Sequence, residues 1–293
     1  MSRAIIVVHN QRSGSALSER QLKALFVKAG FSVTTMIAIS DSLERDLQAH
    51  IKKRSWIAAV GGDGTISAVA GHLAKTDAVL VPIPGGTLNN FTKDLGVEQD
   101  IELAIRAANK GSVTAVDIAS VNDRYFVNNS SIGIYPQSLK VRERTEDKLG
   151  KWPAAVYGIV RALVRFRAYK VTLAGRTIVT PFVFVGNNDY KIDTIDLAGR
   201  TKLTGGKLSV YAVRSARRWG LVRLFGSALL GKLNSANELA VHHAAVITIA
   251  ASSKRRKKIS VSRDGEVMTC TLPLRYEMHK GGLRVVAPRS LAK

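Results

Sequence analysis

A run of five residues places one carboxylate among three glycines. The run is Gly61, Gly62, Asp63, Gly64 and Thr65. Because glycine lacks a Cβ, a ligand can approach this backbone closely. A carboxylate beside phosphate groups repels them unless a cation bridges the two, so Asp63 favours a Mg²⁺-bound nucleotide over a bare anion. A structural turn in which Thr65 caps the next helix would explain the same residues without a ligand.

A second glycine-rich stretch follows at residues 84–91. Its glycines again leave the backbone open, and its short polar side chains can donate and accept hydrogen bonds. The residues with these properties are Gly85, Gly86, Thr87 and Asn89. We call residues 61–65 the first glycine bend and residues 84–89 the second, and we expect both to contact the same nucleotide.

Two carboxylates flank a glycine near the C-terminus, in Asp264-Gly265-Glu266. In such a pair, one carboxylate can accept a proton from a hydroxyl group while the other orients a group or helps to hold a metal. We call residues 264–266 the acidic turn. Without further information, Asp-Gly is simply a turn signal, and a structural turn is the alternative interpretation.

The first half of the chain alternates strand and helix patterns. Apolar runs predict strands at 4–8, 31–39, 56–60 and 78–83, and helical spacing predicts helices at 17–29, 41–53, 66–75 and 101–110. This alternation predicts a doubly wound parallel sheet, in which ligands bind at the carboxyl ends of the strands. Both glycine bends then lie on that rim, together with Asn10, Ser13 and Thr35.

From residue 113 onward the pattern changes to short runs rich in β-branched residues. Such runs, separated by Gly, Asn and Asp, predict an antiparallel β-sandwich. We therefore expect an α/β domain over 1–115 and a β-sandwich domain over 116–293, whose C-terminal segment could return to the first domain. Two apolar segments with basic flanks, 152–167 and 217–233, predict helices that either face the core or lie at a membrane surface.

Composition and net charge limit which partners and which structural features the protein can have. The chain has 293 residues, 46% of them hydrophobic, and a formal net charge of +22. Such a charge favours nucleic acid, anionic lipid or phosphorylated ligands as partners, and the basic run at 254–258 adds to it. Aromatic residues are only 6%, which leaves few platforms for stacking bases. The single cysteine, Cys270, excludes an intrachain disulfide, and no apolar stretch is long enough to predict a membrane-spanning helix.

The first glycine bend resembles the nucleotide loop shared by diacylglycerol, sphingosine and NAD kinases and phosphofructokinases. Residues 84–96 are similar to a second motif, found in the bacterial branch of the diacylglycerol kinase catalytic domain family, and residues 9–14 to the opening motif of that family. NAD kinases and phosphofructokinases share only the first loop. The chain departs from the family pattern at Gln11 and Asn90, and residues 204–209 lack the carboxylates of a structural metal site. Asp189, Asp193 and Asp196, which lie upstream, could supply the missing metal-binding carboxylates.

The resemblance implies an ATP-dependent lipid kinase that uses Mg²⁺ and acts on diacylglycerol or a sphingoid base, with its cleft between the two domains. Asp264 is then the expected base and Glu266 its partner, or the reverse, and Asp63 is the expected metal ligand. The expected ATP-binding residues are Asn10, Ser13, Thr35, Gly61, Gly62, Asp63, Gly64, Thr65, Gly86, Thr87 and Asn89.

We expect a cytoplasmic protein at the inner membrane face, with an anionic membrane surface as partner, a homodimer allowed and no nucleic acid bound. A soluble-metabolite kinase of the NAD kinase type and a basic nucleic-acid-binding protein are the alternatives.

Overall fold

The structure is a computed structural model of the chain. It describes residues 2–10, 17–51, 54–133, 169–173, 175–190, 199–200, 202–213, 239–251 and 257–288. Several sequence predictions lie outside these ranges. They concern Ser13, Asp193, Asp196, residues 254–256 of the basic run, and both segments predicted as helices in the second half, 152–167 and 217–233.

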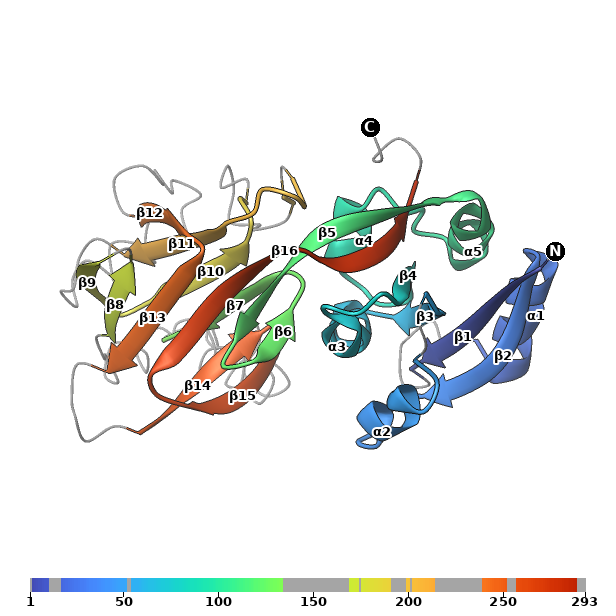
Figure 1. Cartoon of the computed structure of the whole chain (residues 1–293), viewed down its shortest axis with the longest axis horizontal. Helices are drawn as coiled ribbons and strands as arrows, with labels where there is room; N and C mark the ends of the chain where they lie inside the picture. The colour runs from blue at the N-terminus through green and yellow to red at the C-terminus, as the bar shows by residue number, and fades with distance from the viewer. Residues whose placement is uncertain are drawn as a thin grey trace, which may run out of the picture.

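The N-terminal part is a parallel sheet with helices on both faces, which we call the α/β lobe (Figure 1). Strands β2, β1, β3 and β4 are neighbours in that order and run parallel. Helices α1 and α5 pack on one face, while α2, α3 and α4 pack on the other. The bounds are β1 Arg3–His9, α1 Glu19–Lys28, β2 Phe31–Ala38, α2 Leu43–Gln48, β3 Trp56–Gly61, α3 Asp63–Leu73, β4 Val79–Pro84, α4 Asn90–Asp94 and α5 Ile101–Lys110.

The remaining strands form two packed layers, which we call the sandwich lobe. A six-stranded sheet, in the order β12-β11-β10-β7-β14-β15, packs through a buried apolar core against strands β8, β13 and β16. The bounds are β5 Ser112–Val121, β6 Arg124–Phe126, β7 Asn129–Ile132, β8 Tyr169–Leu173, β9 Arg176–Thr180, β10 Val183–Asn187, β11 Leu208–Val213, β12 Leu239–Ala244, β13 Val246–Ala251, β14 Lys258–Arg263, β15 Glu266–Thr271 and β16 Leu274–Ala287. The predicted fold class, α/β followed by an antiparallel sandwich, is confirmed.

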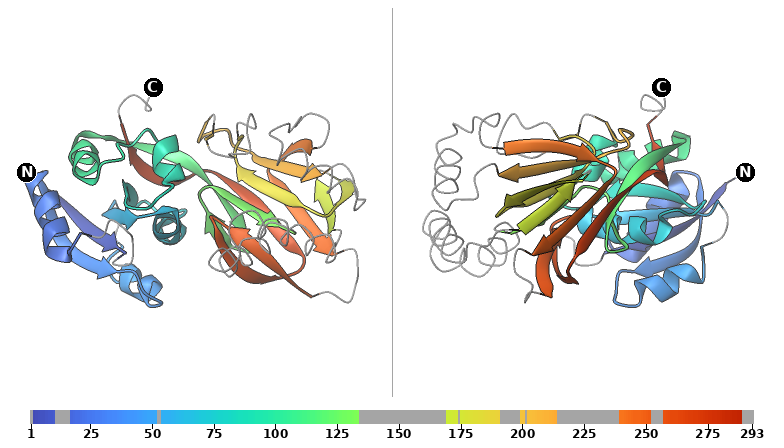
Figure 2. Two further views of the ribbon diagram at one scale, coloured as in Figure 1. Left: turned by 180° about the vertical axis from the view of Figure 1, so that it is seen from behind. Right: turned by 60° about the vertical axis from the view of Figure 1, so that its left-hand side comes forward.

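The long strand β16 joins the two lobes (Figure 2). Its first residues pair antiparallel with β13 in the sandwich, and Arg284 and Val285 pair parallel with β4 in the α/β lobe. Between these segments the register against β5 shifts at a bulge formed by residues 280–282. The bulge is held by Asp117, whose carboxylate accepts hydrogen bonds from the backbone of Gly281 and Gly206. One sheet therefore runs through both lobes and sets their relative placement.

Several elements differ from the sequence prediction. The runs rich in β-branched residues from which strands were predicted do not include β7, β12, β15 or the first half of β16. The residues of β7, Asn129–Ile132, are mostly polar, and Ser130 is buried with its hydroxyl donating to the backbone oxygen of Ser262. Helix α2 is also shorter than predicted and covers only Leu43–Gln48. No helix in the described part of the chain is both long and apolar enough to cross a membrane.

Candidate active site

The site lies where parallel strands β1, β3 and β4 end, as the strand–helix alternation predicts. Asn10 follows β1 directly, its backbone N–H donates to Val60 O, and its side-chain Nδ2 lies 3.4 Å from Thr65 Oγ1. Asn10 is thus tied to the first glycine bend. Thr35 lies within β2 beside Ile6, three positions before Ala38 ends the strand, and is half-buried. It is therefore set back from the rim.

The two glycine bends pack directly against each other. Gly85 N donates to Gly61 O over 2.9 Å. A Cβ on Gly86 would lie 2.5 Å from the Cα of Gly62, closer than real Cβ atoms come to another atom. The absence of side chains at these positions therefore allows the bends to touch and leaves their outer backbone open to a ligand.

The second bend closes on itself through Asn89. This residue adopts a left-handed backbone conformation (φ 52°), which asparagine tolerates better than most residues. Its Oδ1 accepts from Gly86 N and its Nδ2 donates to Gly86 O, both over 2.9 Å. Thr87 and Leu88 remain exposed at the tip of the bend. The loop is therefore held in one shape before any ligand binds.

Asp63 joins the two bends through its side chain. Its Oδ2 accepts from Asn90 N, and its Oδ1 accepts from Phe91 N and from Asn128 Nδ2, over 3.0, 3.0 and 3.2 Å. The carboxylate thereby caps the free N–H groups at the start of α4. A carboxylate offers about four acceptor positions, so one remains on Oδ2 for a cation or a water.

Asp264 occupies a buried position between the lobes. It begins the two-residue loop between β14 and β15, where it and Gly265 both have positive φ, as a type I′ hairpin requires. Its Oδ1 accepts from the backbone N–H groups of Asn128 and Asn129, and its Oδ2 from Val127 N and the hydroxyl of Ser67 on α3. Burial raises the pKa of the Asp264 carboxyl, and these hydrogen bonds oppose the shift. Its acceptor positions are all taken.

Glu266 has the opposite surroundings, although it is only two residues away. Its side chain is exposed, and its Oε1 lies 3.1 Å from the point that a Cβ on Gly64 would occupy. The structure therefore brings the acidic turn of the sandwich lobe against the first glycine bend of the α/β lobe. Glu266 thus places its carboxylate beside Gly64, the residue that follows Asp63 in the chain. In the described part of the chain, no three His, Cys, Asp or Glu side chains are grouped closely enough to hold a metal.

Asn128 and Arg200 lie at the candidate site, although the sequence analysis did not single them out. Asn128 contacts Asp63 through its side chain and Asp264 through its backbone N–H. Arg200 donates to Asn128 Oδ1 and forms a buried ion pair with Asp94, at the end of α4. Neither lies in a recognisable motif, because their partners are distant in the sequence. What identifies both residues is that their polar side chains are buried and hydrogen-bonded, which only the structure shows.

The segment 204–209, where the family pattern would place metal-binding carboxylates, is held instead by side-chain contacts to Asp189. This carboxylate accepts from Ser209 Oγ (2.6 Å), from His243 Nε2 (2.8 Å) and from Lys207 Nζ (2.8 Å). The three donors lower the pKa of Asp189 against the raising effect of its partial burial. A lysine ammonium therefore supplies positive charge at this position.

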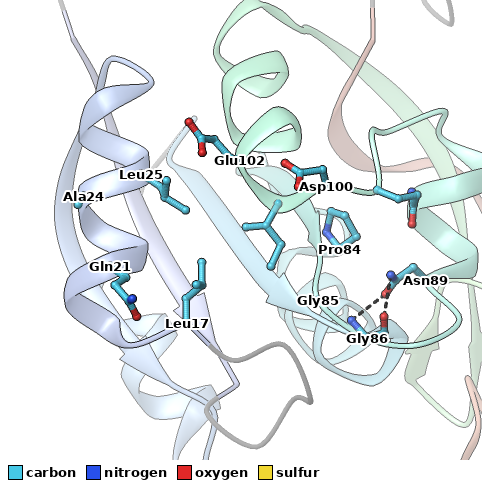
Figure 3. A pocket seen from close by; sticks show the side chains of 12 residues that line it. Leu17, Gln21, Ala24, Leu25, Pro84, Gly85, Gly86, Asn89, Asp100 and Glu102 are labelled. Carbon is cyan, nitrogen blue, oxygen red and sulfur yellow. Dashed lines mark hydrogen bonds between the residues drawn. The ribbon is translucent and has the colours of Figure 1, made fainter.

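A pocket of about 780 Å³ opens beside the second glycine bend, between α1 and the start of α5 (Figure 3). Leu17 and Leu25 form an apolar wall, while Asp100 and Glu102 place carboxylates on the opposite side. Acidic side chains disfavour phosphate groups, so this pocket is unsuited to a triphosphate. The open backbone of the two bends is the better position for phosphates.

The comparisons with known proteins agree with this geometry. Residues 4–121 match the diacylglycerol kinase catalytic domain, and residues 140–287 match the YegS C-terminal NAD kinase beta sandwich-like domain. Among curated relatives, a diacylglycerol kinase of Staphylococcus saprophyticus is 31% identical over 150 residues, covering 49% of this chain and 48% of that protein. A diacylglycerol kinase of Bacillus subtilis is 34% identical over 130 residues, covering 42% and 43%. The chain thus matches about half the length of these relatives.

Solved structures show the same fold over nearly the whole chain. A diacylglycerol kinase from Bacillus anthracis superimposes with a TM-score of 0.68 at 21% identity, covering 99% of this chain and 98% of that one. A candidate diacylglycerol kinase from the same organism gives a TM-score of 0.73 at 22% identity, with the same coverage. Identity at this level shows the fold alone. Because the sandwich match covers half of the chain and the catalytic-domain match most of the rest, the chain belongs to the family in which a diacylglycerol kinase catalytic domain is followed by a YegS C-terminal NAD kinase beta sandwich-like domain.

Proposed function

We propose that the protein is an ATP-dependent lipid kinase that transfers the γ-phosphate to a hydroxyl group of a lipid such as diacylglycerol or a sphingoid base. The observation that carries this proposal is the contact between lobes: the exposed carboxylate of Glu266 lies against Gly64, beside two glycine bends packed on each other. This arrangement sets a proton acceptor beside a backbone suited to phosphates. The names of the matched domain and of the curated relatives support the same activity.

In this proposal the nucleotide phosphates lie along the two glycine bends. The first-turn N–H groups of α3 have no acceptor within the helix, and the dipole of α3 adds positive potential at the same point. Asn10, Gly62 and Thr87 would contribute hydrogen-bonding groups around them, while Gly86, whose N–H is bound by Asn89, would leave room for a close approach. Residues 1–115 would form the ATP-binding domain, and residues 116–293 would hold the lipid.

The donor set fits Mg²⁺ bound together with a nucleotide. Mg²⁺ keeps several waters and needs only one or two carboxylates when phosphates supply further oxygens. Asp63 has one acceptor position left on Oδ2 and would supply one such carboxylate ligand. When bound, Mg²⁺ would neutralise charge on the phosphates.

The geometry favours Glu266 over Asp264 as the base. A base must present a lone pair to the proton that it accepts, and the four acceptor positions of Asp264 are occupied. In the proposed step, Glu266 takes the hydroxyl proton while the lipid oxygen bonds to the γ-phosphorus and the bond to the leaving ADP oxygen breaks. Asp264 would hold the turn that carries Glu266. Of the two assignments that the sequence allowed, we therefore propose the exchanged one.

The net charge of +22 suits an enzyme whose substrate lies in an anionic membrane. We propose that the protein acts in the cytoplasm at the inner face of the membrane, bound peripherally through its basic side chains. A homodimer is compatible with this proposal. Retention on vesicles that contain phosphatidylglycerol, with release by salt, would test the membrane contact.

The activity is tested by offering ATP labelled at the γ-phosphate with a panel of substrates. The panel contains diacylglycerol, a sphingoid base, a total lipid extract, NAD and no acceptor. We expect label in a lipid product that depends on Mg²⁺. Label in NADP and not in lipid would identify a soluble-metabolite kinase, and salt-dependent DNA binding without ATP turnover would identify a nucleic-acid-binding protein.

A further inference from the structure

A closed ring of side-chain contacts surrounds α4, the short helix that follows the second glycine bend. At the start of α4, Asp63 accepts from two backbone N–H groups. At its end, Asp94 Oδ2 accepts from Arg200 Nε over 2.7 Å. Arg200 Nη2 donates to Asn128 Oδ1 over 3.0 Å, and Asn128 Nδ2 donates to Asp63 Oδ1 over 3.2 Å, which closes the ring.

Arg200 is held from every side. Its side chain is fully buried, and that of its ion-pair partner Asp94 is only 7% exposed. Its Nη1 donates to Val127 O over 2.5 Å, and its guanidinium carbon lies 5.6 Å from the centre of the Phe91 ring. A buried arginine is tolerated when it is paired and hydrogen-bonded in this way. Lysine could keep the charge but could not reproduce the planar fork that reaches Asp94 and Asn128 together.

The ring also determines which way the Asn128 amide points. Its oxygen faces a donor on Arg200, and its nitrogen faces the carboxylate of Asp63. The backbone N–H of the same residue donates to Asp264 Oδ1 over 2.8 Å. Asn128 therefore contacts one carboxylate on each side of the site, the one that joins the glycine bends and the one that holds the acidic turn.

We propose that Asn128 and Arg200 are positioning residues that keep the two glycine bends in register with the acidic turn, Arg200 acting through Asn128. The inference rests on the proposed function for its kinetic consequence, but the positioning itself concerns only the protein. Loss of the ring frees the Asp63 side chain and the start of α4 to move relative to Glu266. A displacement of this kind at a reacting centre can lower the rate about 100-fold.

The test compares Asn128→Ala, Arg200→Lys and their double variant with a matched control, Asp117→Asn. Asp117 is likewise a buried carboxylate that binds backbone N–H groups between the lobes, but its side chain accepts from Gly206 and Gly281 and not from a member of the ring. We expect Asn128→Ala to lower kcat roughly 10- to 100-fold and to raise the KM for ATP. Arg200→Lys should act in the same direction, and the double variant should fall short of the product of the single effects, because the two residues act as one unit.

Amide hydrogen exchange provides a readout that does not need activity. Asn128→Ala and Arg200→Lys should speed exchange at residues 61–65 and 90–94, whereas Asp117→Asn should not. Asn128→Ala with unchanged exchange in these segments would overturn the inference, as would kcat and KM within twofold of wild type in an active enzyme. If the wild type transfers no phosphate but exchange is faster in the variants, the proposed function fails while the positioning role stands.

Discussion

The glycine bends and the acidic turn face each other across the site, but they are built in opposite ways. The bends are backbone surfaces: Gly61, Gly62, Gly85 and Gly86 touch because they lack side chains, and their local sequence explains their shape. The acidic turn depends on a buried carboxylate, whose four donors come from α3 and from residues 127–129. The shape of the glycine bends is therefore determined by nearby residues, while the acidic turn depends on contacts between residues far apart in the sequence.

This difference separates two roles within the acidic turn. Asp264 is buried and saturated, whereas Glu266 is exposed at Gly64. We therefore propose a structural role for Asp264 and a chemical role for Glu266, although they lie two positions apart and carry the same charge. The following variants test this distinction, beginning with the one for which we expect the largest effect on stability.

Replacing Asp264 with Asn should destabilise the protein most. One carboxylate oxygen becomes an NH₂ group that faces two donors, which leaves buried N–H or O–H groups without an acceptor. We expect the free energy of unfolding to fall by about 3 kcal/mol and the melting temperature by roughly 6–12 °C. Thermal unfolding followed by circular dichroism measures this, with the exposed Asp41→Asn as control. A melting temperature close to that of the wild type would show that the carboxylate does not hold the turn.

Replacing Gly86 with Ala attacks the contact between the bends. The new Cβ would lie 2.5 Å from Gly62 Cα, so the bends must separate. We expect this to lower the free energy of unfolding by about 1–3 kcal/mol. We expect weaker ATP binding in calorimetric titration together with reduced stability. Gly71→Ala in α3 is the matched control, because the nearest atom lies 3.9 Å away and alanine favours a helix. Equal ATP affinity in the two variants would mean that close packing of the bends is unimportant.

Replacing Asp63 with Ala tests the point where the two bends are joined. Loss of the cap on α4 should lower the free energy of unfolding by about 1 kcal/mol. The KM for Mg²⁺-ATP should rise. Steady-state kinetics at several Mg²⁺ concentrations would show whether the rise in KM depends on the metal. Unchanged kinetics would remove Asp63 from nucleotide binding and leave it a structural role only.

The smallest effect is expected outside both regions, at His279 beside the β16 bulge. Burial lowers the pKa of His279 from its ordinary value of 6.5, and the Lys75 ammonium adds to the shift. The unfolded chain therefore binds more protons than the folded chain between the two pKa values, so stability should fall as the pH drops below about 6.5. Urea unfolding at about pH 7.5 and about pH 5.5 should show a smaller pH effect in His279→Asn than in the wild type. Equal pH effects in both proteins would contradict the assignment.

Much of the fold could be predicted from local patterns. The strand–helix alternation placed β1 to β4 with their helices, and the glycines identified both bends. Asp264-Gly265 was recognised as a turn because its residues suit positive φ. Strand β7 was missed because its polar residues show no apolar alternation, and the buried hydroxyl of Ser130 finds its acceptor, Ser262 O, only when β14 lies beside it.

The connections between lobes could not be predicted in this way. Ser67 and Asp264 are 197 positions apart, and Arg200 reaches Asn128 across 72 positions. Neither pair forms a motif with fixed spacing. The same limitation explains why Asp264 was the first choice for the base: its chemistry suits the role, but its saturation becomes visible only when residues 127–129 are placed against it.

The most direct test of the central claim is the single-turnover rate of phosphate transfer to lipid in Glu266→Gln, measured together with ATP affinity and melting temperature. Glutamine keeps the size of the side chain but cannot accept the proton. We expect the rate to fall about 10²- to 10⁴-fold while ATP affinity and melting temperature stay close to those of the wild type. A Glu266→Gln enzyme that transfers phosphate at nearly the wild-type rate would contradict the assignment of Glu266 as the base.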